Sequence, residues 1–150
     1  MTSLRPQFVD TNIFVHTLFG VDKSKQLRCI KLFQNAKDDQ LKLWTTEWVI
    51  AELVWFLHKQ KFSWIQTKTI ITHILATPGL TVRGKNWLLS VIHFCRKNQD
   101  FIDAANITLA LSVKINSGYS YDRDLDQWSP HFTRLEPYPP TPGETNTHPY

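Results

Sequence analysis

Four acidic residues lie where the sequence could bring carboxylates together to bind a metal ion. They are Asp10, Glu52, Asp103 and Asp122. Asp10 and Asp122 follow short apolar segments that predict strands, and Asp103 stands in the first turn of a predicted helix, before two alanines. Because the carboxyl ends of parallel strands meet at the edge where open α/β folds bind ligands, we expect these carboxylates to face one site.

Glu52 lies in a predicted helix that runs from about 46 to 60. Its neighbours three and four positions away are all apolar: Trp48, Val49, Trp55 and Phe56. The spacing therefore predicts that the carboxylate lies on the buried face of the helix. An ionised carboxylate there costs several kcal/mol unless a cation or hydrogen-bond donors compensate it. The alternative is a glutamate at the edge of the apolar face that reaches solvent or pairs with Lys59.

Two of the other acids also have a structural alternative. Asp10 could cap a helix that begins near Ile13, although Asn12 could take that role and leave Asp10 free to bind a ligand. Asp100 and Asp103 resemble a capping box in which aspartate replaces glutamate. This pairing is a structural signal, and only the expected position of Asp103 at the sheet edge favours a role in binding.

The segment 120–126 has acids at alternate positions, namely Asp122, Asp124 and Asp126. A calcium-binding loop is excluded because Gln127 stands where such a loop requires glycine. A polar turn with solvated acids explains Asp124 or Asp126. Asp122 is nearest to the predicted strand end and is the better candidate for a site.

Together, the four acids predict an anionic pocket that must be filled by cations. Oxygen ligands without His or Cys favour Mg²⁺ or Mn²⁺ over zinc. The chain has a net charge of +4, and setting aside these acids and two in the C-terminal segment leaves about ten excess positive charges. A hard-metal pocket in a basic surface is the charge arrangement of a nuclease, in which metal ions activate water and stabilise the leaving oxygen.

The apolar pattern predicts short strands that alternate with helices. One strand is expected to begin at Phe8, and the others are expected at 41–44, 80–83, 119–121 and 132–135. Two helices are expected to begin near residues 13 and 63, and the others are expected at 22–37, 46–60, 85–97 and 101–115. Such alternation is typical of βαβ units in a parallel sheet covered on both faces. The predicted fold class is therefore α/β.

The length of 150 residues predicts one domain, which we place at 1–136. Five of the eight prolines fall in 137–150, which we expect to be a disordered tail. The two cysteines, Cys29 and Cys95, form no disulfide or zinc pattern, which favours a reducing compartment. No export signal or membrane-spanning segment is predicted, so we expect a cytoplasmic protein without a membrane partner.

The motifs around the acids resemble, in order, those of the PIN-domain ribonucleases. The matching segments are Val9-Asp10-Thr11-Asn12-Ile13-Phe14, Ala51-Glu52-Leu53, Asp100-Phe101-Ile102-Asp103-Ala104-Ala105 and Tyr121-Asp122-Arg123-Asp124-Leu125. The resemblance covers about residues 7 to 136. Within the family, the chain is most similar to the small bacterial and archaeal toxins of VapBC-type toxin–antitoxin pairs.

The resemblance implies an α/β/α sandwich with a parallel central sheet of short strands and a catalytic site that binds Mg²⁺ or Mn²⁺. It implies that the metal ligands and catalytic residues are Asp10, Glu52, Asp103 and Asp122. It also matches Asn12 and Ser120 to supporting polar positions, and Asp100 and Asp124 to positions where a further acid is common. The implied reaction is cleavage of single-stranded or looped RNA by metal-activated water, which leaves 5′-phosphate and 3′-hydroxyl ends.

The implied partners are an RNA substrate, a small antitoxin and further copies of the chain in a homodimer or higher oligomer. We expect the antitoxin to insert an Arg or Lys into the acidic pocket. Its apolar seat would come from Trp48, Val49, Trp55, Phe56 and Trp64. Two alternatives stay open: a non-catalytic RNA-binding or antitoxin-docking module, and an orphan RNA-processing nuclease. A phosphotransferase with a DxD motif is less favoured because Asn12 replaces its second acid.

The six tryptophans of the chain lie among aliphatic residues at helical spacing. We expect them first of all in the core. Stacking on nucleic-acid bases or burial in a partner interface are the alternatives.

Overall fold

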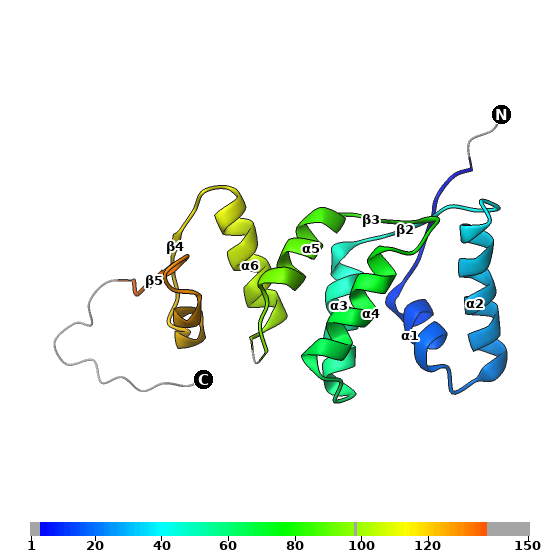
Figure 1. Ribbon diagram of the computed structural model, residues 1–150, viewed down its shortest axis with the longest axis horizontal. Helices are drawn as coiled ribbons and strands as arrows, with labels where there is room; N and C mark the ends of the chain where they lie inside the picture. The colour runs from blue at the N-terminus through cyan, green and yellow to red at the C-terminus, as the bar shows by residue number, and fades with distance from the viewer. Residues whose placement is uncertain (1–3, 98, 138–150) are drawn as a thin grey trace. The chain divides into compact units, whose positions relative to one another are not determined.

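The computed structural model describes residues 4–97 and 99–137, and the chain divides into two compact units. The first unit extends to Ala105 and the second begins at Asn106, within helix α6 (Phe101–Ser112). Figure 1 labels most of the helices and strands of the two units, which are described separately below. The predicted tail lies outside the described residues except for Pro137.

The first unit contains a three-stranded parallel sheet in the order β1-β2-β3. Its strands are β1 (Gln7–Phe8), β2 (Leu43–Thr45) and β3 (Leu80–Val82). Pairs of helices connect them: α1 (Thr11–Phe19) and α2 (Lys23–Lys37) follow β1, and α3 (Glu47–Lys59) and α4 (Trp64–Leu75) follow β2. Helix α5 (Lys85–Phe94) follows β3. Strands joined by helical crossovers in parallel register confirm the predicted α/β class.

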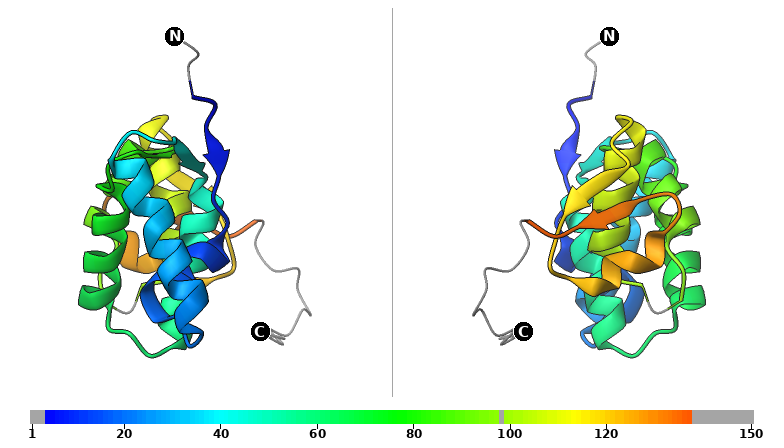
Figure 2. Two further views of the ribbon diagram at one scale, coloured as in Figure 1. Left: turned by 90° about the vertical axis from the view of Figure 1, so that its right-hand side faces the viewer. Right: turned by 90° about the vertical axis from the view of Figure 1, so that its left-hand side faces the viewer.

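The core of this unit is aliphatic and is centred on α3. Ile50, Leu53 and Leu57 are each 0% exposed, and they recur at the three- and four-residue spacing of one helix face. Helix α3 packs against both α1 and α4, as the two views of Figure 2 allow the reader to follow. Full burial of such a side chain stabilises the fold by about 1.5–3 kcal/mol, so this face fixes the orientation of α3.

Helices α3 and α4 begin at hydroxyl residues that cap them. Thr46 caps α3 by accepting a hydrogen bond from the Val49 N–H at 3.3 Å. Ser63 and Gln66 form a complete capping box at the start of α4. Gly79, with φ of +76°, stands where a Cβ would lie 2.2 Å from the Ala36 carbonyl oxygen. Only glycine fits there, so the turn that separates α4 from β3 is fixed.

Two helices are shorter than predicted. Helix α5 ends at Phe94 because Cys95 adopts an extended backbone, with φ of −66° and ψ of 125°. Helix α6 ends at Ser112, where Lys114 takes a left-handed φ of 64° and the Ile115 N–H donates to the Ala110 carbonyl at 2.9 Å. This is the usual way in which a left-handed residue ends a helix.

The second unit contains a parallel pair of strands, β4 (Ser117–Tyr119) and β5 (Thr133–Leu135). The 3₁₀-helix η1 (Arg123–Trp128) lies between them in the chain. Strand β4 begins two residues before the predicted strand and includes Gly118. A Cβ at Gly118 would lie 2.9 Å from the Phe132 ring, so a larger residue there would need this ring to shift.

The described strands thus form two small parallel sheets, and the α/β/α sandwich stays a prediction. In residues 4–97 and 99–137, none of the helices has the length and apolar character needed to cross a membrane.

Candidate functional site

Asp10 lies at the carboxyl end of β1, where neighbouring backbone groups fix the chain. The Val9 N–H donates to the Trp44 carbonyl at 2.9 Å, and the Thr45 hydroxyl donates to the Val9 carbonyl at 2.8 Å. Asp10 occupies the N-cap position of α1, yet its carboxylate accepts no capping hydrogen bond from that helix, all of which the structure describes. The exposed carboxylate therefore stands at the sheet edge and is available for a ligand.

The start of α1 corrects one prediction. The helix begins at Thr11, two residues before the expected position near Ile13. Asn12 consequently lies inside the helix and is exposed, so the expectation that it caps the helix is wrong. The supporting role that the resemblance implies for Asn12 stays a prediction.

Thr11 connects this strand end to α3. Its hydroxyl donates a hydrogen bond to Oε2 of Glu52, and Thr11 itself is only 7% exposed. Thr11 follows Asp10 directly in the chain. The Glu52 carboxylate is therefore bonded to the residue next to Asp10. Sequence reasoning missed Thr11. The sequence does show a hydroxyl residue immediately after the strand-end aspartate. This residue acquires a role only because α1 packs against α3.

Glu52 is exposed, so the prediction that its carboxylate faces the core is wrong. The buried face of α3 is formed by Val49, Ile50, Leu53, Val54 and Leu57. Trp48 and Trp55, on the side of Glu52, are 68% and 58% exposed. The helix is apolar on nearly all sides, and the compact aliphatic residues fill the space against α1 and α4 in place of the tryptophans. Lys59 pairs with the Trp55 ring, at 3.9 Å from its centroid.

An ion pair lies where β2 and β3 end, on the same sheet edge. The Arg83 guanidinium donates to both carboxylate oxygens of Glu47, from Nε at 2.7 Å and from Nη2 at 2.6 Å. These hydrogen bonds lower the pKa of Glu47, and they raise the pKa of Arg83. Glu47 is thus paired with a cation, whereas neither Asp10 nor Glu52 forms an ion pair with a residue that the structure describes.

Asp100 has the structural role that its spacing indicates. Its Oδ1 accepts the N–H of Ile102 at 2.7 Å and the N–H of Asp103 at 3.1 Å, at the start of α6. Asp103 lies half-buried in the first turn of this helix, as predicted. An acid in a first helical turn is also favoured by the helix dipole. A role for Asp103 in metal binding stays a prediction.

The cysteine before this helix is not an activated nucleophile. The Cys95 thiol is buried, and the Trp64 indole donates to the Cys95 carbonyl at 3.0 Å. Burial, with a smaller effect of the Asp100 charge, raises the pKa of the Cys95 thiol to about 11. The thiol is therefore protonated at neutral pH, so hydrolysis through a cysteine thiolate is not supported.

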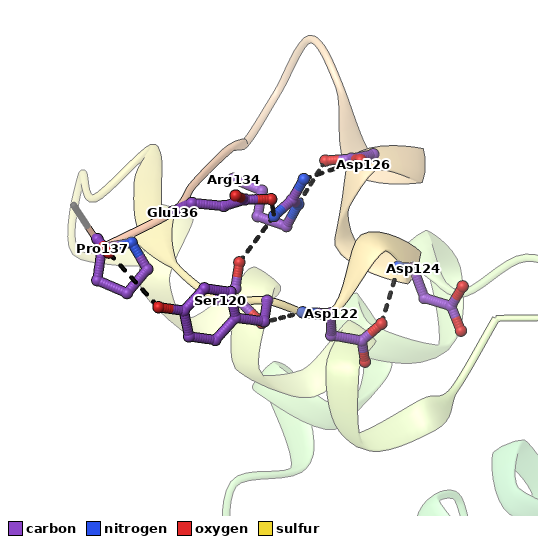
Figure 3. Close-up of polar contacts among 8 residues, drawn as sticks. Ser120, Asp122, Asp124, Asp126, Arg134, Glu136 and Pro137 are labelled. Atoms are coloured by element: carbon purple, nitrogen blue, oxygen red, sulfur yellow. Dashed lines mark hydrogen bonds and ion pairs between the residues drawn. The ribbon is translucent and has the colours of Figure 1, made fainter. Parts of the chain in front are cut away.

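In the second unit, Asp122 caps η1 (Figure 3). The Ser120 hydroxyl oxygen accepts the Asp122 N–H at 3.0 Å, and Asp122 Oδ1 accepts the Asp124 N–H at 2.9 Å. Asp122 and Asp124 are both exposed. Ser120 therefore supports the backbone of Asp122, while the role beside a metal site that the resemblance implies for Ser120 stays a prediction.

Asp126 is an exposed residue of the polar turn, as expected, and it also pairs with Arg134 (Figure 3). The Arg134 guanidinium donates to Asp126 Oδ1 at 2.8 Å, to Glu136 Oε1 at 2.9 Å and to the Ser120 carbonyl at 2.8 Å. The two carboxylates raise the pKa of Arg134. This network ties β5 to the end of β4 and holds the turn that carries Asp122.

Of the four predicted acids, the structure places Glu52 in hydrogen-bond contact with Thr11, the residue that follows Asp10 in the chain. Within the part of the chain that the structure describes, no cluster of three or more His, Cys, Asp or Glu residues could hold a metal ion. Two carboxylates are nevertheless the usual protein contribution to a Mg²⁺ site, because Mg²⁺ keeps several waters and takes further oxygens from substrate phosphates. Asp103 and Asp122 stay predictions as further ligands.

The acids are separate from an apolar groove of about 380 Å³ in the first unit. Phe14, Leu18, Phe33 and Ile74 contribute to its walls, which belong to α1, α2 and α4, and none of the four acids lines it. No protein-family model matches the sequence, and no curated protein is significantly similar to it.

Proposed function

We propose that the protein is a metal-dependent endoribonuclease of the PIN type, in which Asp10 and Glu52 bind Mg²⁺ or Mn²⁺. The observation that carries the proposal is the Thr11 hydrogen bond, which ties Glu52 of α3 to the residue that follows the strand-end Asp10. The Asp10 carboxylate accepts no capping hydrogen bond from α1, all of which the structure describes, and this supports a role in binding over one in capping. Both acids lie at the carboxyl edge of a parallel sheet, where α/β enzymes place their chemistry.

The side chains at such a site have different roles. Asp10 and Glu52 supply hard oxygen ligands, and Thr11 restricts the carboxylate of Glu52 to one orientation. A bound Mg²⁺ or Mn²⁺ supplies Lewis acidity, which favours ionisation of a water and stabilises charge on the phosphodiester. The net charge of +4 attracts a polyanion to the surface around these acids. Asp103 and Asp122 are included in the proposal as further ligands on the basis of the family resemblance.

The proposal extends to the role of a toxin in a toxin–antitoxin pair. An antitoxin that places Arg or Lys between Asp10 and Glu52 would displace the metal and block RNA together. The exposure of both carboxylates supports such access. The predicted seat for the antitoxin needs one correction, because Val49 is buried and only Trp48 and Trp55 of that set are exposed.

Cleavage of a labelled RNA by the purified protein tests the proposal. We expect cleavage with Mg²⁺ or Mn²⁺, loss of cleavage with EDTA or with zinc alone, and no cleavage by Asp10→Asn or Glu52→Gln. Asp38→Asn, a change of an exposed acid at the end of α2, is the matched control and should cleave normally. Cleavage that persists in EDTA, or in both site variants, would refute the proposal. A wild-type protein that binds RNA but never cleaves it would identify the non-catalytic alternative.

A further inference from the structure

One face of α3 carries Trp48, Glu52, Trp55 and Lys59 at spacings of four, three and four residues. At about 100° per residue, these four positions fall within an arc of about 60°. The two tryptophans, at 68% and 58% exposed, flank the carboxylate that Thr11 holds at the sheet edge. The candidate metal ligand thus lies between two large aromatic surfaces.

The exposure of these tryptophans is not needed to complete the core. Ile50, Leu53 and Leu57 already bury the opposite side of α3 completely. Each exposed indole leaves a large apolar surface in contact with water, which has an energetic cost that an aliphatic core residue avoids. This face is therefore suited to a ligand that brings flat apolar groups.

Lys59 indicates the charge of that ligand. Its ammonium lies 3.9 Å from the centroid of the Trp55 ring, a cation–π contact that covers one face of the indole. Trp55 is nevertheless 58% exposed, so a ligand that contacts it meets a positive charge beside the ring. A flat group attached to a negatively charged chain matches this arrangement, and nucleic acid has this chemistry.

We propose that Trp48 and Trp55 stack against unpaired bases of the RNA substrate on either side of Glu52, and that Lys59 contacts a backbone phosphate. The proposal rests on the proposed function, since a metal at Glu52 offsets the repulsion between its carboxylate and the phosphates. The tryptophans are seven residues apart, which is about 10 Å along the helix axis. They therefore hold different bases, and the phosphodiester between those bases lies at Glu52. Bases paired in a duplex present no free faces to such rings.

Trp→Ala variants and RNA with and without bases test this inference. The probes are a fluorescein-labelled single-stranded RNA of about 12 nucleotides and the same RNA with abasic internal positions, with Ca²⁺ in place of Mg²⁺ to slow cleavage. We expect Trp48→Ala and Trp55→Ala each to weaken binding of the intact RNA by about 5- to 100-fold. The same variants should change the affinity for the abasic RNA by less than about twofold, because this RNA has no internal bases that could stack on the tryptophans.

Three controls make the result specific. Trp48→Phe and Trp55→Phe should recover most of the affinity because they keep an aromatic face. Ile65→Ala, a change of a 77% exposed residue on α4, should leave binding unchanged. Sedimentation of each variant should show the oligomeric state of the wild-type protein.

The outcomes separate this inference from the proposed function. Trp→Ala variants that bind intact RNA normally, or that lose affinity for both RNAs equally, overturn the stacking role even if Mg²⁺-dependent cleavage is intact. Variants that dissociate a wild-type oligomer without a base-specific loss of affinity identify the face as a contact between copies of the chain. A wild-type protein that binds neither RNA and cleaves none overturns both proposals.

Discussion

Replacement of Thr11 by valine removes the hydroxyl that holds Glu52 and keeps the shape of the side chain. Hydrogen bonds to charged groups stabilise proteins by about 1.5–3 kcal/mol. Here the Glu52 carboxylate is exposed and water replaces the lost donor, so we expect the free energy of unfolding to fall by less than about 1 kcal/mol. We expect Thr11→Val instead to weaken metal binding, because loss of a residue that orients a metal ligand typically lowers metal affinity by about 10- to 100-fold.

The assay is RNA cleavage as a function of Mg²⁺ concentration. Thr11→Val should raise the concentration for half-maximal activity by about tenfold or more, and high Mg²⁺ should restore much of the rate. Thr11→Ser keeps the donor and should behave like the wild-type protein. A Thr11→Val protein with the wild-type metal dependence would refute the argument that this hydrogen bond positions the site. If Thr11 had a purely structural role, Thr11→Val would lower the free energy of unfolding and leave the Mg²⁺ concentration for half-maximal activity unchanged.

Three further predictions concern groups outside the proposed metal site. The hydrogen bonds from Arg83 hold the pKa of Glu47 below its usual 4.5, so the pair stabilises the fold at neutral pH and this stability is lost as the pH falls from about 4.5 through the lowered pKa. Glu47→Gln should therefore flatten the fall in the free energy of urea unfolding at acidic pH, and an unchanged pH profile would refute the assignment. Asp100→Ala should lower that free energy by about 1 kcal/mol because α6 loses its cap, with Asp100→Asn closer to wild type, whereas equal effects of the two variants would contradict capping. The pKa of about 11 predicts that Cys95 in the folded protein reacts with iodoacetamide much more slowly than after unfolding, and equal rates would show that the thiol is accessible and activated.

Local signals in the sequence predicted much of the fold. Thr46 and Ser63 have the hydroxyls that cap helices, and the structure confirms both as caps. The alternation of apolar segments predicted parallel strands, which both sheets contain. Asp100 was recognised as a capping residue from its spacing to Asp103. These features depend on a few consecutive residues, so the sequence specifies them directly.

The errors concern features that tertiary packing decides. The sequence of α3 is apolar on several sides, and only its contacts with α1 and α4 select Leu53 over Trp55 as the buried side. Thr11 acquires its role only when α1 lies against α3 and brings Glu52 within reach. A pattern of spacing within one helix contains no information on such contacts.

The central claim is that Asp10 and Glu52 together hold a divalent metal ion. Binding of Mn²⁺ to the full-length protein, followed by electron paramagnetic resonance as free Mn²⁺ disappears, tests it without reliance on an RNA substrate. The account predicts that the wild-type protein and Asp38→Asn bind Mn²⁺ alike, and that Asp10→Asn and Glu52→Gln each weaken binding by about tenfold or more. Mn²⁺ binding that is unchanged in both site variants would contradict the account.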